Sequence, residues 1–352
     1  MTITEIEERV DAALNAEECV SFDKARFKEQ VNVTINDATQ QIDRVVKRYV
    51  AFNMAFASLL TVEFALFVIF FTLLAQSSTL AISLAAMFLT LFTYLTLRLY
   101  LQARKPEQLL DIRDRFLSSC KEIISYHDGV AEHHMALASA CCRVTASLHN
   151  REYSFYPPPE KMDFLNPTFL TFSCWWHWRD LHAIREAFMI AAIEEHIKLV
   201  KCEPTDLEVH ATLANAYVML SSLYADPRKA EGYDEDRWIP PQRYSEAMRE
   251  NFRATAERAI QEFKILNEYA PNDPWVHAQL AYSYHDLQMP EEEIKQYETI
   301  LRISRNDKEA LFKLGMLYFQ QGRNADGLRI YEQLKGSNYK KAENLIKFYG
   351  AY

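Results

Sequence analysis

Residues 51–104 read AFNMAFASLLTVEFALFVIFFTLLAQSSTLAISLAAMFLTLFTYLTLRLYLQAR. Two apolar runs, residues 51–76 and about 79–101, flank a short polar turn, and Glu63 is the one acidic or basic residue before Arg98. Each run supplies the roughly 20 residues that a helix needs to cross about 30 Å of hydrocarbon. Both runs carry Phe and Leu on every face, which is more apolar surface than a soluble domain of this size would bury. The sequence therefore predicts a transmembrane helical hairpin.

The charges around the hairpin predict its orientation, because Lys and Arg are enriched in cytoplasmic loops. The turn at Gln76–Ser78 carries no charge, whereas the outer ends of both runs are basic. The flanking cations are Arg44, Lys47, Arg48, Arg98, Arg104 and Lys105. We therefore expect an integral membrane protein with two spans and both termini in the cytoplasm. A hairpin this tight favours a bacterial inner membrane over an organelle membrane.

Glu63 lies near the middle of the first span, where a charged carboxylate is costly. A lone intramembrane acid usually finds a local partner, so we expect a protonated carboxyl bonded to Ser83, Thr90 or Thr93, or to another subunit. A functional role for Glu63 is the alternative. No second acid or base lies in the spans to extend a proton or ion path.

The composition limits the remaining classes of function. The chain has 352 residues, a net charge of −9 and seven glycines. The acidic balance argues against nucleic acid, which requires a basic stripe, and the scarcity of glycine and of alternating runs predicts an all-α chain. The six cysteines show no CxxC pair and indicate reduced thiols. With no glycine-rich phosphate loop, HExxH or GxSxG, we expect no enzyme and no cofactor.

One polar cluster is the best candidate for a metal site. It contains His127, Asp128, Glu132, His133 and His134. Their spacing matches no standard metal site, and they lie at a predicted helix break where polar residues gather. We therefore expect no metal; an enzyme that used this cluster would have to contain one.

The segments beside the hairpin, residues 1–50 with an acidic helical start and residues 105–128, predict two stalk helices. Pro106 is expected to begin the second one. Apolar residues in both segments step by three and four, as in a heptad seam. The seam residues are Phe27, Val31, Ile35, Ala38, Ile42, Val45 and Tyr49, then Leu109, Ile112, Phe116, Cys120, Ile123 and His127. The seams either pair with each other or pair with their copies in a homo-oligomer.

Residues 129–352 read as a repeat array. Residues 274–307, PWVHAQLAYSYHDLQMPEEEIKQYETILRISRND, align with residues 308–335, KEALFKLGMLYFQQGRNADGLRIYEQLK, at a period of 34. The matched pairs are Leu280/Leu314, Ala281/Gly315, Tyr284/Tyr318, Tyr297/Tyr331 and Ile300/Leu334. This pattern resembles the tetratricopeptide repeat (TPR) family. Glu293 and Gly327 depart from it, since the family usually has Ala there.

Two upstream units resemble the family less completely and contain insertions near residues 150–179 and 226–243. Their helix residues are Leu137, Ala138, Cys141, Ala192, His196 and Leu199 in the first, and Leu213, Ala214, Tyr217, Ala259, Phe263 and Leu266 in the second. His196 occupies a packing position, so we interpret it as a core histidine. The resemblance implies a four-repeat α-solenoid, and residues after 336 predict a C-terminal capping helix.

The first insertion is unusually aromatic. From Phe155 to Trp178 it reads FYPPPEKMDFLNPTFLTFSCWWHW, with Trp175, Trp176 and Trp178 near its end. We expect this loop to fold back over the exposed end of the first repeat. An interfacial membrane anchor or a second partner-binding surface is the alternative.

The resemblance also implies a binding groove, which TPR proteins line with helix-A side chains. In register with the family, these are Asn215, Trp275, Tyr282, His285, Asp286, Phe312, Met316 and Phe319. The set lacks Lys and Arg, so a carboxylate-clamp ligand is not expected, and an apolar peptide or helix of a protein partner fits better. We therefore expect a membrane-anchored TPR scaffold at the cytoplasmic face. The alternative is a structural subunit of a membrane-embedded secretion, division or transport complex.

Overall fold

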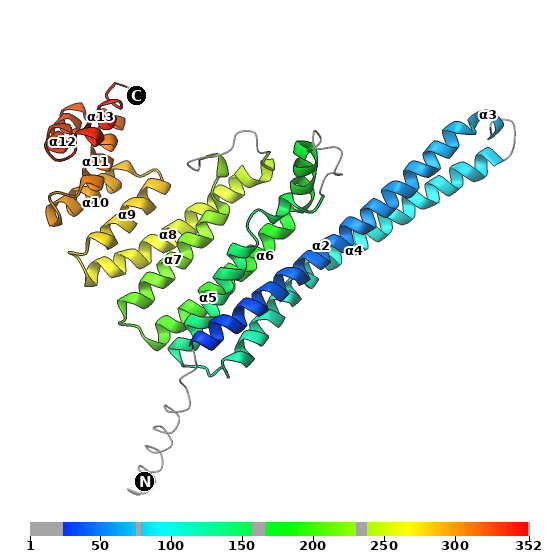
Figure 1. The fold of residues 1–352 in the computed structure, drawn as a ribbon, viewed down its shortest axis with the longest axis horizontal. Helices are drawn as coiled ribbons and strands as arrows, with labels where there is room; N and C mark the ends of the chain where they lie inside the picture. The colour runs from blue at the N-terminus through cyan, green and yellow to red at the C-terminus, as the bar shows by residue number, and fades with distance from the viewer. Residues whose placement is uncertain (1–23, 75–78, 157–165, 230–237, 351–352) are drawn as a thin grey trace, which may run out of the picture. The chain divides into compact units, whose positions relative to one another are not determined.

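The computed structural model describes residues 24–74, 79–156, 166–229 and 238–350. Within these ranges the chain is helical without β-strands (Figure 1), which confirms the all-α prediction. The N-terminal acidic segment up to residue 23 and the turn at Gln76–Ser78 lie outside the described residues. The helices are α2 (Lys24–Ile69), α3 (Phe71–Leu74), α4 (Thr79–Ile123), α5 (Ala131–Ser147), α6 (Asn166–Cys202), α7 (Leu207–Tyr224), α8 (Glu246–Tyr269), α9 (Pro274–Asp286), α10 (Pro290–Ile303), α11 (Lys308–Gln320), α12 (Asn324–Ser337) and α13 (Tyr339–Ile346), with short 3₁₀ turns at Arg151–Tyr153, Pro227–Lys229 and Pro241–Tyr244.

The chain forms two compact units. The N-terminal unit contains Met1–Ala192 with Asp234–Pro240, and the C-terminal unit contains Ile193–Tyr233 with Pro241–Tyr352. The sequence placed the boundary near residue 128 instead. The difference arises because α5 and the first part of α6 share one apolar core with the stalk halves of α2 and α4.

Helices α2 and α4 pack along each other as a long hairpin (Figure 1). Both are long and apolar enough to cross a membrane, and the most apolar stretch of each is not buried by the protein. At 1.5 Å per residue, the 45 residues of α4 extend about 68 Å, roughly twice the hydrocarbon thickness. Each helix is therefore long enough for a membrane half and a stalk half.

The stalk halves bury the predicted seams, with two shifts in register. Val46 is buried where Val45 was predicted, and Ile124 is buried where Ile123 was predicted. His127 is exposed because α4 ends at Ile123, before the predicted end of the seam. Helix α4 also continues through Pro106, which was expected to start a new helix. An interior proline removes one N–H donor and crowds the carbonyl four residues earlier. Lys105 and Leu109, on either side of Pro106, are both buried, so this part of α4 is packed against its neighbours.

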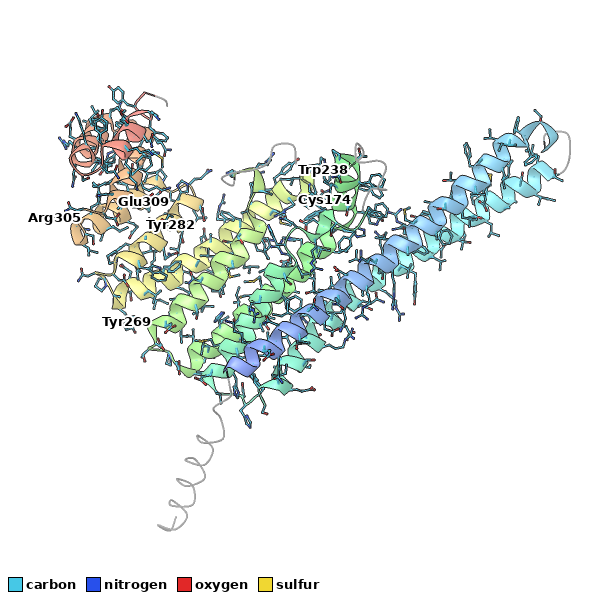
Figure 2. The ribbon with its side chains drawn as sticks, viewed as in Figure 1. Cys174, Trp238, Tyr269, Tyr282, Arg305 and Glu309 are labelled. Atoms are coloured by element: carbon cyan, nitrogen blue, oxygen red, sulfur yellow. The ribbon has the colours of Figure 1, made fainter. Side chains whose placement is uncertain are left out.

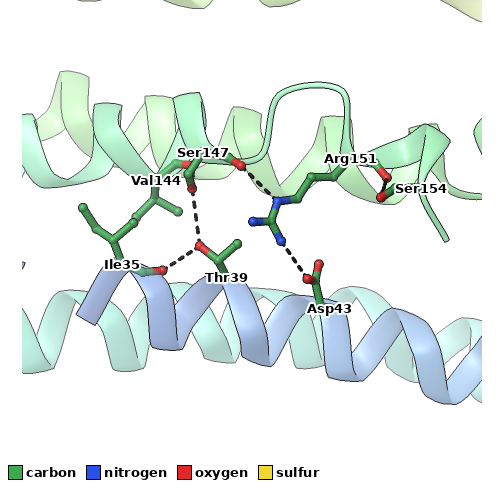
Figure 3. Close-up of polar contacts among 7 residues, drawn as sticks. All are labelled: Ile35, Thr39, Asp43, Val144, Ser147, Arg151 and Ser154. Atoms are coloured by element: carbon green, nitrogen blue, oxygen red, sulfur yellow. Dashed lines mark hydrogen bonds and ion pairs between the residues drawn. The ribbon is translucent and has the colours of Figure 1, made fainter. Parts of the chain in front are cut away.

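A set of polar contacts joins α2 to α5 and to the turn after it (Figure 3). The Arg151 guanidinium lies 2.6 Å from the Asp43 carboxylate and also donates to the Ser147 carbonyl at 3.0 Å. The hydroxyls of Thr39 and Ser147 are 3.3 Å apart. These contacts bridge the rim of the apolar core, so α5 is fixed in position along the stalk.

The C-terminal unit consists of neighbouring helix pairs. Helix α7 packs against α8, α9 against α10, and α11 against α12, and α13 contacts both α11 and α12. Helices α7, α9 and α11 begin with the same N-cap, in which the carboxylate of Asp206, Asp273 or Asp307 accepts a backbone N–H from the first turn. This cap satisfies donors that the helix itself leaves free. The same local signal therefore starts the first helix of each pair.

Small residues allow these helices to approach one another closely. Ala214 and Ala281 are fully buried, and a Cβ at Gly315 would lie 2.7 Å from Leu345 of α13 and 3.0 Å from Ile330 of α12. Gly315 therefore allows both α12 and α13 to approach closely, and the tighter contact is with α13, the predicted C-terminal helix.

Candidate functional site

Glu63 bonds to the partner helix inside the hairpin. The Thr90 hydroxyl donates to Glu63 Oε1 at 2.8 Å, and Glu63 Oε2 is buried without a hydrogen-bond partner among the described residues. Thr90 is one of the three partners that the sequence suggested. This contact lies on the inner side of the hairpin, so it joins α2 to α4.

At the base of the membrane half, a buried ion pair joins α4 to α6. The Lys105 ammonium pairs with the Asp180 carboxylate, and the Lys105 side chain is almost fully buried. The ammonium also lies 4.9 Å from the ring centroid of Tyr49, whose hydroxyl donates to Gln108 at 3.1 Å. No local sequence pattern predicts this pair, because residues 75 positions apart meet only in the folded core.

The three tryptophans predicted as a second surface have three different environments. All lie in α6, because residues 166–179 are helical and not part of a loop; residues 157–165 lie outside the described chain. Trp178 is buried, so it cannot bind a partner. Trp176 is half-buried beneath the Arg98 guanidinium, 4.7 Å from its ring centroid, and Trp175 is 53% exposed.

The residues that follow the 3₁₀ turn at Arg151–Tyr153 pack into the N-terminal unit. Phe155 and Tyr156 are buried, and the Ser173 hydroxyl accepts the Phe155 backbone N–H while donating to the Glu152 carbonyl. His177 is fully buried against both aromatic rings, and burial, with the Lys105 charge adding to it, lowers the pKa of His177 to about 3. The start of the aromatic insertion therefore packs into the core of the N-terminal unit.

The predicted groove residues of α9 lie on its exposed face. Trp275 is 42% exposed and Tyr282 is 48% exposed, and His285 and Asp286 are exposed as well. Trp275 and Tyr282 are seven residues apart, which places them on one side of the helix two turns apart. The opposite side of α9 is buried through Val276, Leu280, Ala281 and Tyr284. In α7, the predicted groove residue Asn215 is exposed too.

In α11, the predicted groove residues are largely covered. Phe319 is only 3% exposed, so it does not line an open surface as predicted. Phe312 and Met316 are half-buried; the ring of Phe348 lies 6.4 Å from that of Phe312, and the ring of Tyr349 lies 5.7 Å from that of Phe319. The chain after α13 therefore covers the face that the sequence assigned to a ligand.

The two departures from the repeat pattern explain why equivalent positions differ. His285 and Phe319 are 34 residues apart, as are Glu293 and Gly327. The buried Glu293 carboxylate lies 3.1 Å from His285, whereas a Cβ at Gly327 would lie 2.5 Å from the Phe319 ring. The missing side chain of Gly327 thus makes room for a buried Phe319. In the preceding pair, Glu293 keeps His285 at the surface, and burial raises the pKa of Glu293 although His285 opposes the shift.

Two histidines make the same contact with a proline carbonyl, which the sequence analysis did not predict. His210 Nε2 lies 3.1 Å from the Pro204 carbonyl, and His277 Nε2 lies 3.0 Å from the Pro271 carbonyl. The signal was present, since each histidine follows its proline by six residues and its capping aspartate by four. The second ring nitrogens have different partners: His210 Nδ1 contacts the Glu262 carboxylate at 3.0 Å, and His277 Nδ1 contacts the Gln296 amide oxygen at 2.8 Å.

Other candidate histidines are packed in the core. His196 is buried, as predicted from its packing position, and burial lowers its pKa to about 4. His133 and His134 are also buried, and His133 Nδ1 accepts the backbone N–H of His127 at 3.1 Å. Among the residues that the structure describes, no cluster of three His, Cys, Asp or Glu side chains has metal-binding geometry.

No protein-family model matches the sequence, and no curated protein matches it either. The repeat resemblance therefore depends on the residues themselves.

Proposed function

We propose that this protein is a membrane-anchored adaptor of the TPR type, which binds a protein partner through the exposed face of α9. The hairpin of α2 and α4 inserts in a membrane, with both chain ends and the C-terminal unit on the cytoplasmic side. A bacterial inner membrane fits this arrangement. The adaptor raises the local concentration of its partner at the membrane surface, which requires no chemical step.

The exposed pair Trp275 and Tyr282 carries this proposal. Large aromatic side chains that remain exposed on one helix face, while the opposite face is fully packed, have the composition of binding hot spots. Asp286, four residues after Tyr282 and eleven after Trp275, adds an acidic group at the end of the same face. A partner helix or peptide with apolar anchors and a basic residue suits such a face.

The repeated elements support the TPR assignment. The neighbouring helix pairs, the aspartate caps and the buried residues at 34-residue spacing have the properties expected for that family. The basic residues at the ends of the apolar runs support the proposed orientation. Arg44, Lys47, Arg48 and Arg104 are exposed there and can face anionic headgroups.

Site-specific photo-crosslinking in intact cells tests the proposal. A photoreactive amino acid replaces Tyr282 in the full chain, and the control replaces Tyr269, which is 62% exposed and lies apart from Tyr282 at the end of α8 (Figure 2). We expect a discrete crosslinked partner from position 282 and none from position 269. The double variant Trp275→Ala/Asp286→Asn should reduce the adduct. Equal adducts at both positions, or none at 282, would contradict a binding face on α9.

A further inference from the structure

Helix α6 runs parallel to α4 and contacts it at successive levels of the N-terminal unit. Arg98 meets Trp176, Lys105 meets Asp180, and the ring of Phe116 packs edge-on against that of Phe188 at 5.5 Å. The residue numbers of these contacts increase together in both helices. The two helices can therefore be compared level by level.

The change from apolar to charged sequence occurs at the same level in both helices. In α4, no acidic or basic residue lies between Thr79 and Leu97, and Arg98 is the first charge. In α6, residues 166–178 contain no Asp, Glu, Lys or Arg, and Arg179 is the first charge. The one histidine in that segment, His177, is buried and neutral at physiological pH because of its lowered pKa. In each helix, the change from apolar to charged sequence thus lies on the N-terminal side of the Lys105–Asp180 pair.

The uncharged start of α6 also carries exposed aromatic side chains. Phe172 and Trp175 are both exposed, and their ring centroids lie 6.2 Å apart. They belong to the part of α6 that contains Cys174 (Figure 2), while Ser173, Cys174 and His177 are buried on its other side. The exposed apolar surface of α4 around Phe92 and Leu95 continues to this level through Leu99 and Tyr100.

At the level of the Arg98–Trp176 contact, aromatic rings surround the Arg98 guanidinium. Its guanidinium carbon lies 4.7 Å from the Trp176 ring and 5.9 Å from the Tyr94 ring, and the Tyr94 hydroxyl donates to Asn53 at 3.2 Å. A cation in contact with Trp and Tyr rings, at the point where apolar sequence changes to charged sequence, is typical of a membrane–water interface. An amphipathic helix with exposed Trp and Phe inserts at this depth.

We propose that residues 166–178 of α6 lie in the cytoplasmic interface of the bilayer, with Phe172 and Trp175 in contact with lipid. This inference rests on the proposed insertion of the hairpin. The hairpin and α6 would form a three-helix membrane contact, in which Arg98 and Trp176 fix the depth of the N-terminal unit. The occupant is lipid because the exposed surface of α6 continues the lipid-facing surface of α4.

The experiment uses the full chain reconstituted in phospholipid vesicles whose acyl chains carry bromine near the headgroup or near the chain end. Bromine quenches the fluorescence of a neighbouring tryptophan, and the chain has five tryptophans. We expect shallow bromine to quench the wild-type signal. Trp175→Phe should lose a large part of the quenched signal, whereas the control Trp275→Phe, in the C-terminal unit, should lose none of it.

A second reporter separates this inference from hairpin insertion. Phe92→Trp places a tryptophan on the exposed face of α4, where Phe92 is exposed, and deep bromine should quench it. If Phe92→Trp is quenched while Trp175→Phe loses nothing, residues 166–178 are not interfacial, although the hairpin inserts. If neither position is quenched, both proposals fail. If the fluorescence of Trp175 is not quenched by bromine but changes with protein concentration, a second copy of the chain covers α6 and the assignment to lipid is wrong.

Discussion

The membrane half of the hairpin and the helix pairs of the C-terminal unit are both built from antiparallel helices, but they treat large apolar side chains in opposite ways. In the hairpin, Phe64, Phe88 and Phe92 remain exposed. In the C-terminal unit, Phe263 is buried in a cluster with Ala214 and Leu280, and Phe319 is buried where Gly327 leaves room for its ring. The helix pairs cover their own apolar surface, whereas the described residues leave the apolar surface of the hairpin exposed.

The largest expected effect compares one phenylalanine from each region. Phe263→Ala removes a fully buried ring and should lower the free energy of unfolding by about 3–5 kcal/mol. Phe88→Ala, at a side chain that is 70% exposed, should change it by less than about 1 kcal/mol. Denaturant titration of the full chain in mild detergent, monitored by circular dichroism, measures both. Equal losses would mean that protein covers the outer face of the hairpin.

A glycine substitution tests how closely the helix pairs are fitted. Gly→Ala inside a helix ordinarily stabilises it by about 0.5–1 kcal/mol. At Gly327 the added Cβ would meet the Phe319 ring at 2.5 Å, so Gly327→Ala should instead cost about 1–3 kcal/mol.

The control is Gly336→Ala in the same helix, where a Cβ meets nothing within 4 Å and the usual stabilisation should return. The double variant Phe319→Leu/Gly327→Ala should be more stable than the sum of its single variants predicts, as thermal unfolding of all four proteins would show. Strictly additive losses would show that Phe319 and Gly327 do not interact, and the explanation for the burial of Phe319 would be wrong.

A smaller effect is expected inside the hairpin. Thr90→Val removes the hydroxyl that donates to Glu63 and should weaken the pairing of α2 with α4 by about 0.6 kcal/mol, the usual value for a hydrogen bond between membrane helices. Thr96→Val is the matched control, because the Thr96 hydroxyl donates to the Phe92 carbonyl of its own helix. Unfolding by increasing fractions of sodium dodecyl sulfate compares the two. A larger loss at Thr96 than at Thr90 would contradict the pairing role of Glu63.

The smallest expected effect is a pH dependence that contrasts the two histidine contacts. Burial lowers the pKa of His210, but the hydrogen bonds to Glu262 and to the Pro204 carbonyl outweigh burial and raise the net pKa above its usual value. The pair therefore stabilises the fold fully below about pH 6.5, and this stabilisation is lost as the pH rises through the raised pKa.

Glu262→Gln gives His210 a neutral amide partner, as His277 has in Gln296. The variant should therefore lose the decrease in the free energy of unfolding that the wild type shows between about pH 6 and 8. The control Glu268→Gln changes an exposed carboxylate on the same helix and should leave the slope as it is. Parallel curves for the wild type and Glu262→Gln would show that His210 does not titrate with its partner.

Much of this architecture was predictable from local sequence. The length of the uninterrupted apolar runs predicted two helices able to cross a membrane, because hydrocarbon thickness sets a minimum length. The 34-residue register placed Leu280, Ala281 and Tyr284 in the core, and they are buried. Thr90 was among the predicted partners of Glu63, because helices joined by a tight turn bring a limited set of residues together.

Contacts between distant segments could not be predicted in this way. The Lys105–Asp180 pair, the burial of Phe319 over Gly327 and the three environments of the tryptophans depend on which helices meet and at what depth. Likewise, α4 continues through Pro106, which local sequence predicted as a helix start, and the buried Lys105 and Leu109 on either side of it contact distant parts of the chain. The helices and the apolar face of each one follow from local sequence, since they depend on neighbours three or four positions away. Which of those faces become covered follows from the tertiary fold, since the covering side chains lie far away in the chain.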